Sequence, residues 1–377
     1  MKYMIVAGEA SGDLHASNVI ARLRQLDSGA EFRFLGGDLM ATASGREPEI
    51  HYDRMNVMGF AEVVRHLPTL LSILREAKRM VREWRPDVLL LVDYPSFNLR
   101  LARYAVRRGV RVEWFISPKV WAWKEWRVKT LKRVVARMYC ILPFEIPFYR
   151  KHDYGGAVYV GNPSVGEIDH ALGHLPPLKY FLERQGVTDT RPIIALLPGS
   201  RRSEISTNLP LMLEAARRFS DYQIIVAAAP AVPEKFYREI AQDPGLALSF
   251  GSTVTLLKYS RAALVTSGTA TLETALVGTP QVVCYRASGK EWMYNVMEKV
   301  LKVKYVSLPN LIMGNSIVPE LLLHKCTAES IAHELSPLLQ NSPQREWQLS
   351  GYRNMRRRLG NDDAARRVAE LVYNSVK

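Results

Sequence analysis

The stretch MKYMIVAGEASGD, residues 1–13, shows the pattern that decides the fold: a short apolar run, then a glycine-containing turn and the start of a helical pattern. The same order of features recurs along the chain, for example around LLLVDYPSFN (89–98) and LLPGSRRSEI (196–205). Short apolar runs that alternate with longer helical patterns are typical of βαβ units and parallel sheets. The sequence therefore predicts an α/β protein.

The apolar runs fall into two groups, separated by a polar, proline-containing stretch around residues 162–192. This break predicts two Rossmann-like, doubly wound domains with a cleft between them, 1–165 and 166–345, and helices in 346–377 that pack back on the first domain. The predicted strands are Tyr3–Ala7, Phe32–Leu35, Val88–Val92, Val110–Ile116, Met138–Leu142 and Ala157–Val160 in the first domain, and Ile193–Leu197, Gln223–Ala228, Leu246–Phe250, Ala262–Val265 and Gln281–Tyr285 in the second.

Composition narrows the class of protein and of partner. The 377 residues are 47% hydrophobic and 23% charged, a balance that excludes a disordered or fibrous chain. The net charge of +14 lies mostly in the first domain and the tail, and it favours anionic substrates, membrane surfaces or nucleic acid as partners. A nucleic-acid-binding module would interleave aromatic and basic residues in a recognisable pattern, and none is present, so we expect no nucleic acid partner.

The compartment follows from the cysteines and the apolar runs. Three widely spaced cysteines exclude a disulfide framework and fit a reducing cytosol. The apolar run near the start is too short for a signal peptide, and no run approaches the roughly 20 residues that span a bilayer. We therefore predict a cytoplasmic protein, or one attached to a membrane from outside.

The GEASGD turn (8–13) places polar groups at the end of the first strand, where such sheets bind ligands. Ser11, Gly12 and Asp13 would offer an anion or a sugar hydroxyl a seat at a helix N-terminus. Helix capping by Ser11 or Asp13 explains them equally well. Glu9 is harder to explain by structure alone, because a carboxylate at a strand end has little structural purpose.

Asp93 directly follows the apolar strand of LLLVDYPSFN. A carboxylate at the edge of a low-dielectric core tends to have a raised pKa, which suits a general base. The alternative is that Asp93 caps the turn before Pro95. We favour the catalytic interpretation.

Two loops of the second domain look like anion seats. In the first, Ser200 and Arg201 stand where a Pro-Gly turn meets a helix, and backbone amides with a guanidinium suit a diphosphate. In the second, Ser267, Gly268 and Thr269 begin a helix on which Glu273 lies one turn further on, placed to bind a diol such as a ribose. Either loop alone would fit simple capping, whereas both together favour nucleotide binding.

Other residues give weaker signals. Trp121 and Trp123 lie among basic residues and would stack on a sugar or pack internally, while for Trp126 we favour packing between helices. The histidines lack ligand spacing, so we predict no metal site and no cofactor.

The segment 55–85 begins with apolar residues, among them Val57, Met58 and Phe60, and continues as a basic amphipathic helix. Such a helix either contacts a membrane surface or an acyl chain, or packs on its own sheet. The positive charge of this region favours the membrane.

Taken in order, the motifs resemble those of the lipid A disaccharide synthase family of Gram-negative bacteria. The resemblance spans most of the chain, and the motifs are highly specific only as a set. They are GEASGD (8–13), VMGFAEV (57–63), VDYPSFN (92–98), SPKVWAW (117–123), ILPFE (141–145), LLPGSR (196–201), SGTATLE (267–273) and VSLPNLI (306–312).

The resemblance implies a hexosyltransferase of the GT-B type in lipid A (lipopolysaccharide) biosynthesis. It implies transfer of 2,3-diacylglucosamine from UDP-2,3-diacylglucosamine to 2,3-diacylglucosamine 1-phosphate, which gives the β-1,6-linked disaccharide 1-phosphate and UDP with inversion and without an essential metal. Asp93 would be the base, with Glu9 and Asp13 as the other carboxylates near the cleft, and GEASGD would face the acceptor. Arg201, Ser267, Thr269, Glu273 and Asn310 would line the UDP site. The enzyme would act at the cytoplasmic face of the inner membrane, and the sequence does not decide whether it forms a homo-oligomer.

Two positions depart from the family pattern, and rival functions remain. Ser96 stands where the family has a second aspartate, which makes Asp93 the sharper candidate, and Asn162 replaces a histidine. The rivals are another GT-B enzyme acting on a UDP-sugar, such as a polyprenyl-acceptor transferase or an epimerase, and a non-catalytic basic membrane-binding protein.

Overall fold

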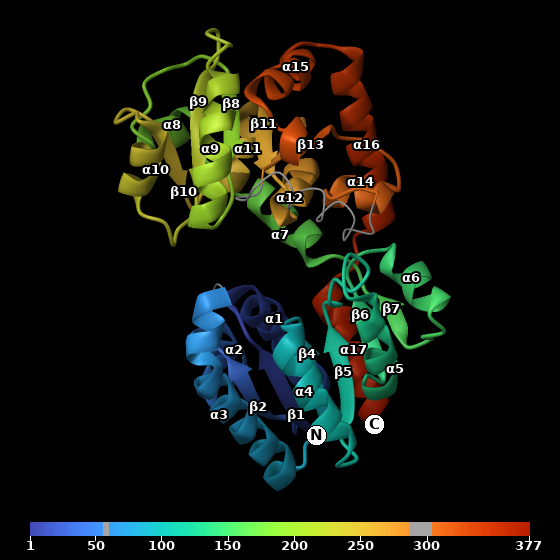
Figure 1. The fold of residues 1–377 in the computed structure, drawn as a ribbon. Helices are drawn as coiled ribbons and strands as arrows, with labels where there is room; N and C mark the ends of the chain where they lie inside the picture. Colours follow the sequence, from blue (N-terminus) through green and yellow to red (C-terminus); the bar gives the residue numbers. More distant parts are fainter. Residues whose placement is uncertain (56–59, 287–303) are drawn as a thin grey trace. The chain divides into compact units, whose positions relative to one another are not determined.

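Two separate parallel sheets organise the chain (Figure 1). The computed structural model describes residues 1–55, 60–286 and 304–377, and for residues 60–66 it describes the backbone alone. The first domain comprises Met1–Pro163 together with Asn361–Lys377, and the second comprises Ser164–Gly360. Both are α/β units with a parallel sheet, as the sequence predicts.

The first sheet has the strand order β3-β2-β1-β4-β5-β6-β7, with every neighbouring pair parallel. The direction in which strands are added reverses between β1 and β4, so the switch point at which such sheets bind ligands lies between their carboxyl ends. The strands are β1 (Lys2–Ala7), β2 (Glu31–Gly36), β3 (Ile50–His51), β4 (Val88–Val92), β5 (Arg111–Phe115), β6 (Arg137–Cys140) and β7 (Ala157–Tyr159).

Helices cover both faces of this sheet, which explains why its central strands are apolar throughout. Along β4, Leu89 and Leu91 belong to the core under α3, α4 and α5, whereas Leu90 and Val92 belong to the core under α1 and α17. The helices are α1 (Ala10–Leu26), α2 (Asp38–Ser44), α3 (Phe60–Trp84), α4 (Pro95–Val106), α5 (Val128–Val134), α6 (Glu145–Lys151) and α17 (Ala364–Val376), with short 3-10 turns η1 (Tyr52–Arg54) and η2 (Glu125–Arg127).

The second sheet has the order β10-β9-β8-β11-β12-β13, again parallel at every pair. Its switch point lies between β8 and β11. The strands are β8 (Ile193–Leu197), β9 (Gln223–Ala228), β10 (Ala247–Phe250), β11 (Ser260–Thr266), β12 (Gln281–Tyr285) and β13 (Glu320–Leu322). The helices are α7 (Pro163–Leu172), α8 (Leu178–Arg184), α9 (Arg202–Ala216), α10 (Glu234–Ala241), α11 (Thr253–Tyr259), α12 (Thr269–Val277), α14 (Leu308–Met313), α15 (Ala328–Leu339) and α16 (Pro343–Leu359), with the 3-10 turn η3 (Leu323–Lys325).

The C-terminal helices divide between the domains, which corrects the expectation that all of 346–377 packs on the first. Helix α16 stays with the second domain, where the buried Gln348 side chain accepts from the N–H of Gln281 at 2.9 Å. Only α17 returns to the first domain, where Val368 and Val372 are buried against α1 and the sheet (Figure 1). Gly360, with φ of 70°, ends α16 and allows the chain to leave it.

No helix among the described residues is both long and apolar enough to cross a bilayer.

Candidate active site

At the switch point of the first sheet, the turn after β4 carries Asp93 and the turn after β1 carries Glu9. Burial, together with the nearby Glu9 carboxylate, raises the pKa of Asp93 to about 6. The Lys119 ammonium, from the turn after β5, and the N–H of Tyr94 act in the opposite direction. The structure thus brings together the two carboxylates that the sequence singles out as candidate bases, and adds a cation that it did not.

The turn that carries Asp93 has an uncommon backbone conformation. Asp93 and Tyr94 have φ of 42° and 47°, in the left-handed region of backbone conformation that residues other than glycine rarely adopt. The Asn98 side chain holds this turn, because its Nδ2 donates to the carbonyl of Asp93 at 2.8 Å and to that of Val92 at 3.3 Å. Strained backbone that the surroundings hold in place is a common property of active sites.

The ring of Tyr94 joins the turns after β1 and β4. A Cβ atom added at Gly8 would lie 2.4 Å from this ring, so only glycine leaves room for it. The Tyr94 hydroxyl donates to the carbonyl of Met55 at 2.7 Å, which fixes the ring from its other end. The first glycine of GEASGD is therefore explained by packing against Tyr94.

Within GEASGD, the structure separates the residues that face solvent from those that support the fold. Glu9 and Ser11 are exposed, and the Ser11 hydroxyl donates to Glu9 at 2.8 Å. Gly12 is buried, and a Cβ atom there would lie 3.2 Å from that of Ala7. Of the three residues predicted on the acceptor side, only Ser11 is therefore open to a ligand.

Asp13 has a structural partner of its own. Its buried carboxylate accepts from the N–H groups of Gly37 at 2.6 Å, Leu39 at 3.1 Å and Met40 at 3.3 Å, all at the start of α2. A carboxylate at a helix N-terminus satisfies amides that lack a partner within the helix. Asp13 therefore caps a helix, as the capping alternative predicts, but the helix is α2 and not its own helix α1. These contacts explain the presence of an aspartate here without a substrate.

In the second domain, the amides expected to hold a diphosphate are occupied. The Glu204 carboxylate accepts from the N–H of Ser200 at 3.1 Å and from that of Arg201 at 3.3 Å, and it lies 3.5 Å from the Arg201 guanidinium. Gly199 has φ of 122°, which brings this turn close to Glu204. An anion at this position would have to displace Glu204, so the prediction of free amides at this turn is wrong. The exposed Arg201 guanidinium remains the candidate contact.

The start of α12, on the neighbouring strand β11, is open instead. Gly268 occupies the N-cap position with φ of 145°, and in the part of the chain that the structure describes no side chain caps the helix. The hydroxyl of Thr266 is buried, with no hydrogen-bond partner among the described residues. Ser267 and Thr269 are at least partly exposed beside it, so the uncapped amides of α12 suit a phosphate.

Glu273 lies on the second turn of α12 and is partly buried. Burial raises the pKa of its carboxyl, and the Glu167 carboxylate of α7 adds to that effect. The structure therefore places Glu273 one turn from the open end of α12, as the sequence predicts.

Asn310 is fully buried, and protein groups use its amide completely. Nδ2 donates to the carbonyl of Val318 at 2.9 Å and to Glu320 at 2.8 Å, while Oδ1 accepts from the N–H groups of Ile317 and Val318. Glu320 also accepts from the hydroxyl of Ser307 at 2.6 Å. These contacts make Asn310 a support for the segment between α14 and β13, and they leave its amide no free group for UDP.

Three tryptophans follow β5. Trp121 is half-buried and donates from Nε1 to the buried Glu145 carboxylate at 3.2 Å, so an interior hydrogen bond fixes its ring. Trp123 is 51% exposed with the Lys124 ammonium 3.9 Å from its ring centre. Trp126 is 65% exposed, so the expectation that it packs between helices is wrong.

The predicted membrane segment is described only in part. Val57 and Met58 lie outside the described residues, as does the side chain of Phe60, the first residue of α3. Further along α3, Leu67 and Leu71 are exposed, whereas Leu74 belongs to the core.

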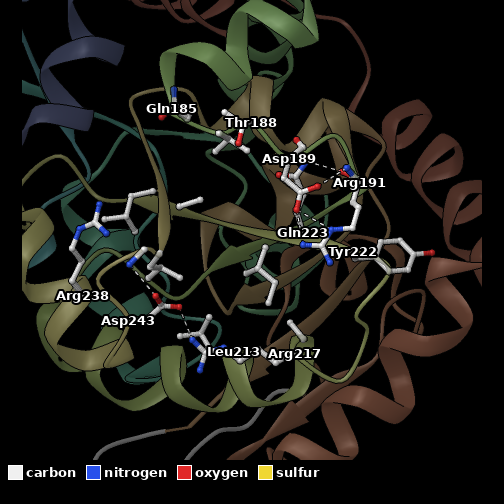
Figure 2. A pocket seen from close by; sticks show the side chains of 18 of the residues that line it. Gln185, Thr188, Asp189, Arg191, Leu213, Arg217, Tyr222, Gln223, Arg238 and Asp243 are labelled. Carbon is white, nitrogen blue, oxygen red and sulfur yellow. Dashed lines mark hydrogen bonds and ion pairs between the residues drawn. The ribbon is translucent and has the colours of Figure 1, made fainter.

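Among the described residues there is no group of three or more histidine, cysteine or acidic side chains that could hold a metal. A cavity of about 820 Å³ lies elsewhere in the second domain, at the amino ends of β8, β9 and β10 (Figure 2). Its charged groups largely pair with one another, as in Arg191 with Asp189 at 2.8 Å and Arg217 with Asp243 at 2.8 Å. It is therefore separate from the carboxyl ends where the predicted residues gather.

Five residues with contacts at these sites were not predicted from the sequence: Asn98, Lys119, Glu145, Glu204 and Glu320. Asn98, Lys119, Glu145 and Glu204 stand inside the quoted stretches, so polar residues near the chosen ones were the available signal. Their partners lie in other segments of the chain, which local patterns do not reveal.

Comparisons with known proteins agree with the motifs. Residues 3–372 match the protein-family model described as "Lipid-A-disaccharide synthetase". The chain is 42% identical to a lipid-A-disaccharide synthase of Myxococcus xanthus over 98% of this chain and 96% of the relative. Among solved structures, it resembles a UDP-GlcNAc 2-epimerase from Neisseria meningitidis bound to UDP-GlcNAc, at a TM-score of 0.69 and 13% identity over 99% of this chain and 100% of that one.

It also resembles the glycosyltransferase of kitacinnamycin, at a TM-score of 0.63 and 12% identity, over 100% of this chain and 99% of that one. At such low identity these structures show the fold alone, which is the fold of GT-B glycosyltransferases and epimerases. The family match and the identity over nearly the whole chain show more: this chain belongs to the lipid-A-disaccharide synthase family.

Proposed function

We propose that this chain transfers 2,3-diacylglucosamine from UDP-2,3-diacylglucosamine to 2,3-diacylglucosamine 1-phosphate, with Asp93 as the general base. Family membership supports the substrate pair. The single observation that carries the assignment of the base is Asp93 itself. It is a part-buried carboxyl in a strained turn at the switch point, with its pKa raised towards neutrality.

In the proposed reaction, the acceptor 6-oxygen attacks the anomeric carbon of the donor as the 6-hydroxyl proton passes to the Asp93 carboxylate. The bond from that carbon to the UDP oxygen breaks, and UDP leaves with the bonding electrons. Attack opposite the leaving group inverts the configuration and gives a β-1,6 linkage. A base with a pKa near 6 is ionised at neutral pH and still accepts a proton readily.

The groups proposed to hold UDP lie in the second domain. The open start of α12, at Gly268 and Thr269, offers backbone amides to the diphosphate, and Arg201 offers a positive charge. Glu273 is placed to hydrogen-bond a ribose hydroxyl. We propose that these groups stabilise the leaving diphosphate without a metal ion.

The test of the reaction is product analysis. The purified protein is incubated with both substrates and excess EDTA, and the products are identified by mass spectrometry and by the NMR coupling of the new anomeric proton. We expect UDP and a β-linked disaccharide 1-phosphate. An α-linked product, or a product formed only when metal is restored, would overturn the inverting, metal-free mechanism.

Replacement of Arg201 by alanine should raise KM for the UDP-sugar by roughly 10–100-fold, because a charge-assisted contact to the diphosphate is lost. Arg202 is the matched control, since it is also exposed at the start of α9 but its guanidinium lies 5.1 Å from the Phe236 ring centre. Steady-state kinetics of Arg201→Ala and Arg202→Ala test this. Equal KM values for the two variants would remove Arg201 from the donor site.

We also propose that the first domain docks on the anionic face of the inner membrane. Helices α4 and α5 and the residues just after α4 carry exposed cations and no acidic residue, and the Arg103 guanidinium donates to the Thr130 hydroxyl across the two helices at 3.2 Å. We call this set the basic face: Arg100, Arg103, Arg107, Arg108, Lys129, Lys132 and Arg133. Basic residues at an anionic membrane contribute about 1 kcal/mol each.

Charge reversal should therefore release the protein from membranes. Arg100→Glu with Arg107→Glu should weaken binding to vesicles containing phosphatidylglycerol by at least about tenfold at low salt. The same reversal at Arg353 and Arg357, exposed on α16 of the second domain, is the control and should have little effect. Cosedimentation measures both. Equal losses from the two double variants would show a response to net charge, not to the basic face.

A further inference from the structure

Glu145 is a buried carboxyl that the proposed reaction does not use. It is 1% exposed and is the first residue of α6, directly after the turn that follows β6. The carboxyl end of β6 lies on the same edge of the sheet as that of β4, with β5 between them. Burial raises the pKa of Glu145 to about 7. A buried acid costs stability unless its partners compensate, so its contacts need an explanation.

The contacts of Glu145 connect the turn after β6 to the turn after β5. One carboxyl oxygen accepts from the N–H of Leu142 at 3.1 Å, and the other accepts from Nε1 of Trp121 at 3.2 Å. Hydrogen bonding to the Ser117 side chain also favours the charged form of Glu145. Trp121 is held a second time, because its ring packs edge-on against Phe144 with the ring centres 4.9 Å apart.

Interior hydrogen bonds fix both ends of a five-residue loop, Ser117–Trp121. At one end, the hydroxyls of Ser117 and Tyr149 share a hydrogen bond of 2.7 Å in the interior. At the other end is Trp121, and between them Val120 is buried. The exposed residue of this loop is Lys119, whose ammonium charge acts on Asp93. The contacts of Glu145 therefore help to hold the loop that carries Lys119, the cation whose charge acts on Asp93.

We propose that Glu145 is a positioning residue: through Trp121 and Ser117 it holds the Ser117–Trp121 loop so that Lys119 stays beside Asp93. The inference rests on the proposed function, in which Asp93 is the base. Two charged groups act on Asp93, namely Glu9 after β1 and Lys119 after β5, and the backbone N–H of the adjacent Tyr94 also acts on it. Lys119 is the only cation named in this set, so its displacement should favour the protonated form of Asp93.

The test is a double-mutant cycle between Glu145→Leu and Lys119→Met, read from the pH profile of kcat/KM. Each single variant should move the acidic limb to higher pH and lower kcat/KM at pH 6 by about threefold to tenfold. The double variant should be no worse than Lys119→Met alone, because residues that act through one another are not additive. Trp121→Phe, which removes the hydrogen-bond donor and keeps a ring against Phe144, should shift the limb in the same direction with less disturbance of the fold.

Additive losses in the double variant, or an unmoved acidic limb in Glu145→Leu and Trp121→Phe, would overturn the proposal. Glu145→Gln keeps one acceptor for Trp121 and should recover part of the loss.

A second readout needs no substrate. The pH dependence of the stability difference between each protein and its Asp93→Asn counterpart reports the pKa of Asp93 directly. In the Glu145→Leu background this dependence should move to higher pH. If the wild-type protein shows no acceptor-dependent transfer, the proposed function fails, and this stability measurement still decides the role of Glu145.

Discussion

Asparagine in place of Asp93 should lower kcat for transfer by about 10²–10⁴-fold, because the acceptor hydroxyl loses its base. The change keeps the size of the side chain, and asparagine tolerates the left-handed backbone found at this position. UDP affinity, measured by calorimetry, should be unchanged, since the groups proposed to hold UDP lie in the other domain. Turnover close to that of the wild type would move the base to another carboxylate, with Glu9 the next to test.

The same substitution should stabilise the first domain at neutral pH. Asp93 has a pKa of about 6 in the folded chain against an ordinary 3.8, so the folded state binds the proton more tightly than the unfolded state. The stability of the wild-type protein therefore falls as the pH rises from about 4 to above 6, and asparagine, which does not ionise, avoids this loss. We expect Asp93→Asn to be more stable by about 1–3 kcal/mol at pH 7.5 and to show no gain below about pH 4. Denaturant unfolding at both values measures the gap, and equal stability at pH 7.5 would show that Asp93 is not destabilised by burial.

Replacement of Asp13 by alanine should destabilise the first domain by about 2–4 kcal/mol, because it leaves three buried or partly buried amides at the start of α2 without an acceptor. Asp38→Ala is the matched control. Asp38 lies in the first turn of the same helix, but its side chain is 97% exposed, so its loss should cost less than about 1 kcal/mol.

Kinetics separate this structural role from the alternative on the acceptor side. The folded fraction of Asp13→Ala should have near-normal KM values. A variant as stable as the wild type but with a raised acceptor KM would show that Asp13 contacts the acceptor after all.

The fold and the location of the site follow closely from local sequence patterns. Every predicted strand is present, and the central strands were the clearest to predict because apolar runs buried on both faces leave a strong signal. The strands β3 and β13 were not predicted, since they contain two and three residues at the sheet edges and carry no such run. The candidate residues after β1 and β4, and those after β8 and β11, follow the carboxyl ends of strands that are neighbours at the two switch points.

The roles of individual polar residues were harder to predict, because they depend on partners distant in the sequence. Asp13 caps a helix 25 residues away, which no pattern within GEASGD indicates. Asn310 resembles a ligand-binding residue in the motif, but its side-chain amide donates to the Val318 carbonyl and to the Glu320 carboxylate. Glu204 lies in the first turn of α9, and its carboxylate accepts from the N–H groups of Ser200 and Arg201 just before that helix. A local pattern thus identified the loops but not the atoms that remain free in them.

The most direct test is the rate of UDP release from UDP-2,3-diacylglucosamine, measured in the presence of EDTA with and without 2,3-diacylglucosamine 1-phosphate. We predict release that depends on the acceptor, persists in EDTA and is lost in Asp93→Asn. Release that ignores the acceptor, or that Asp93→Asn retains in full, would contradict the proposal that this chain joins the two sugars with Asp93 as its base.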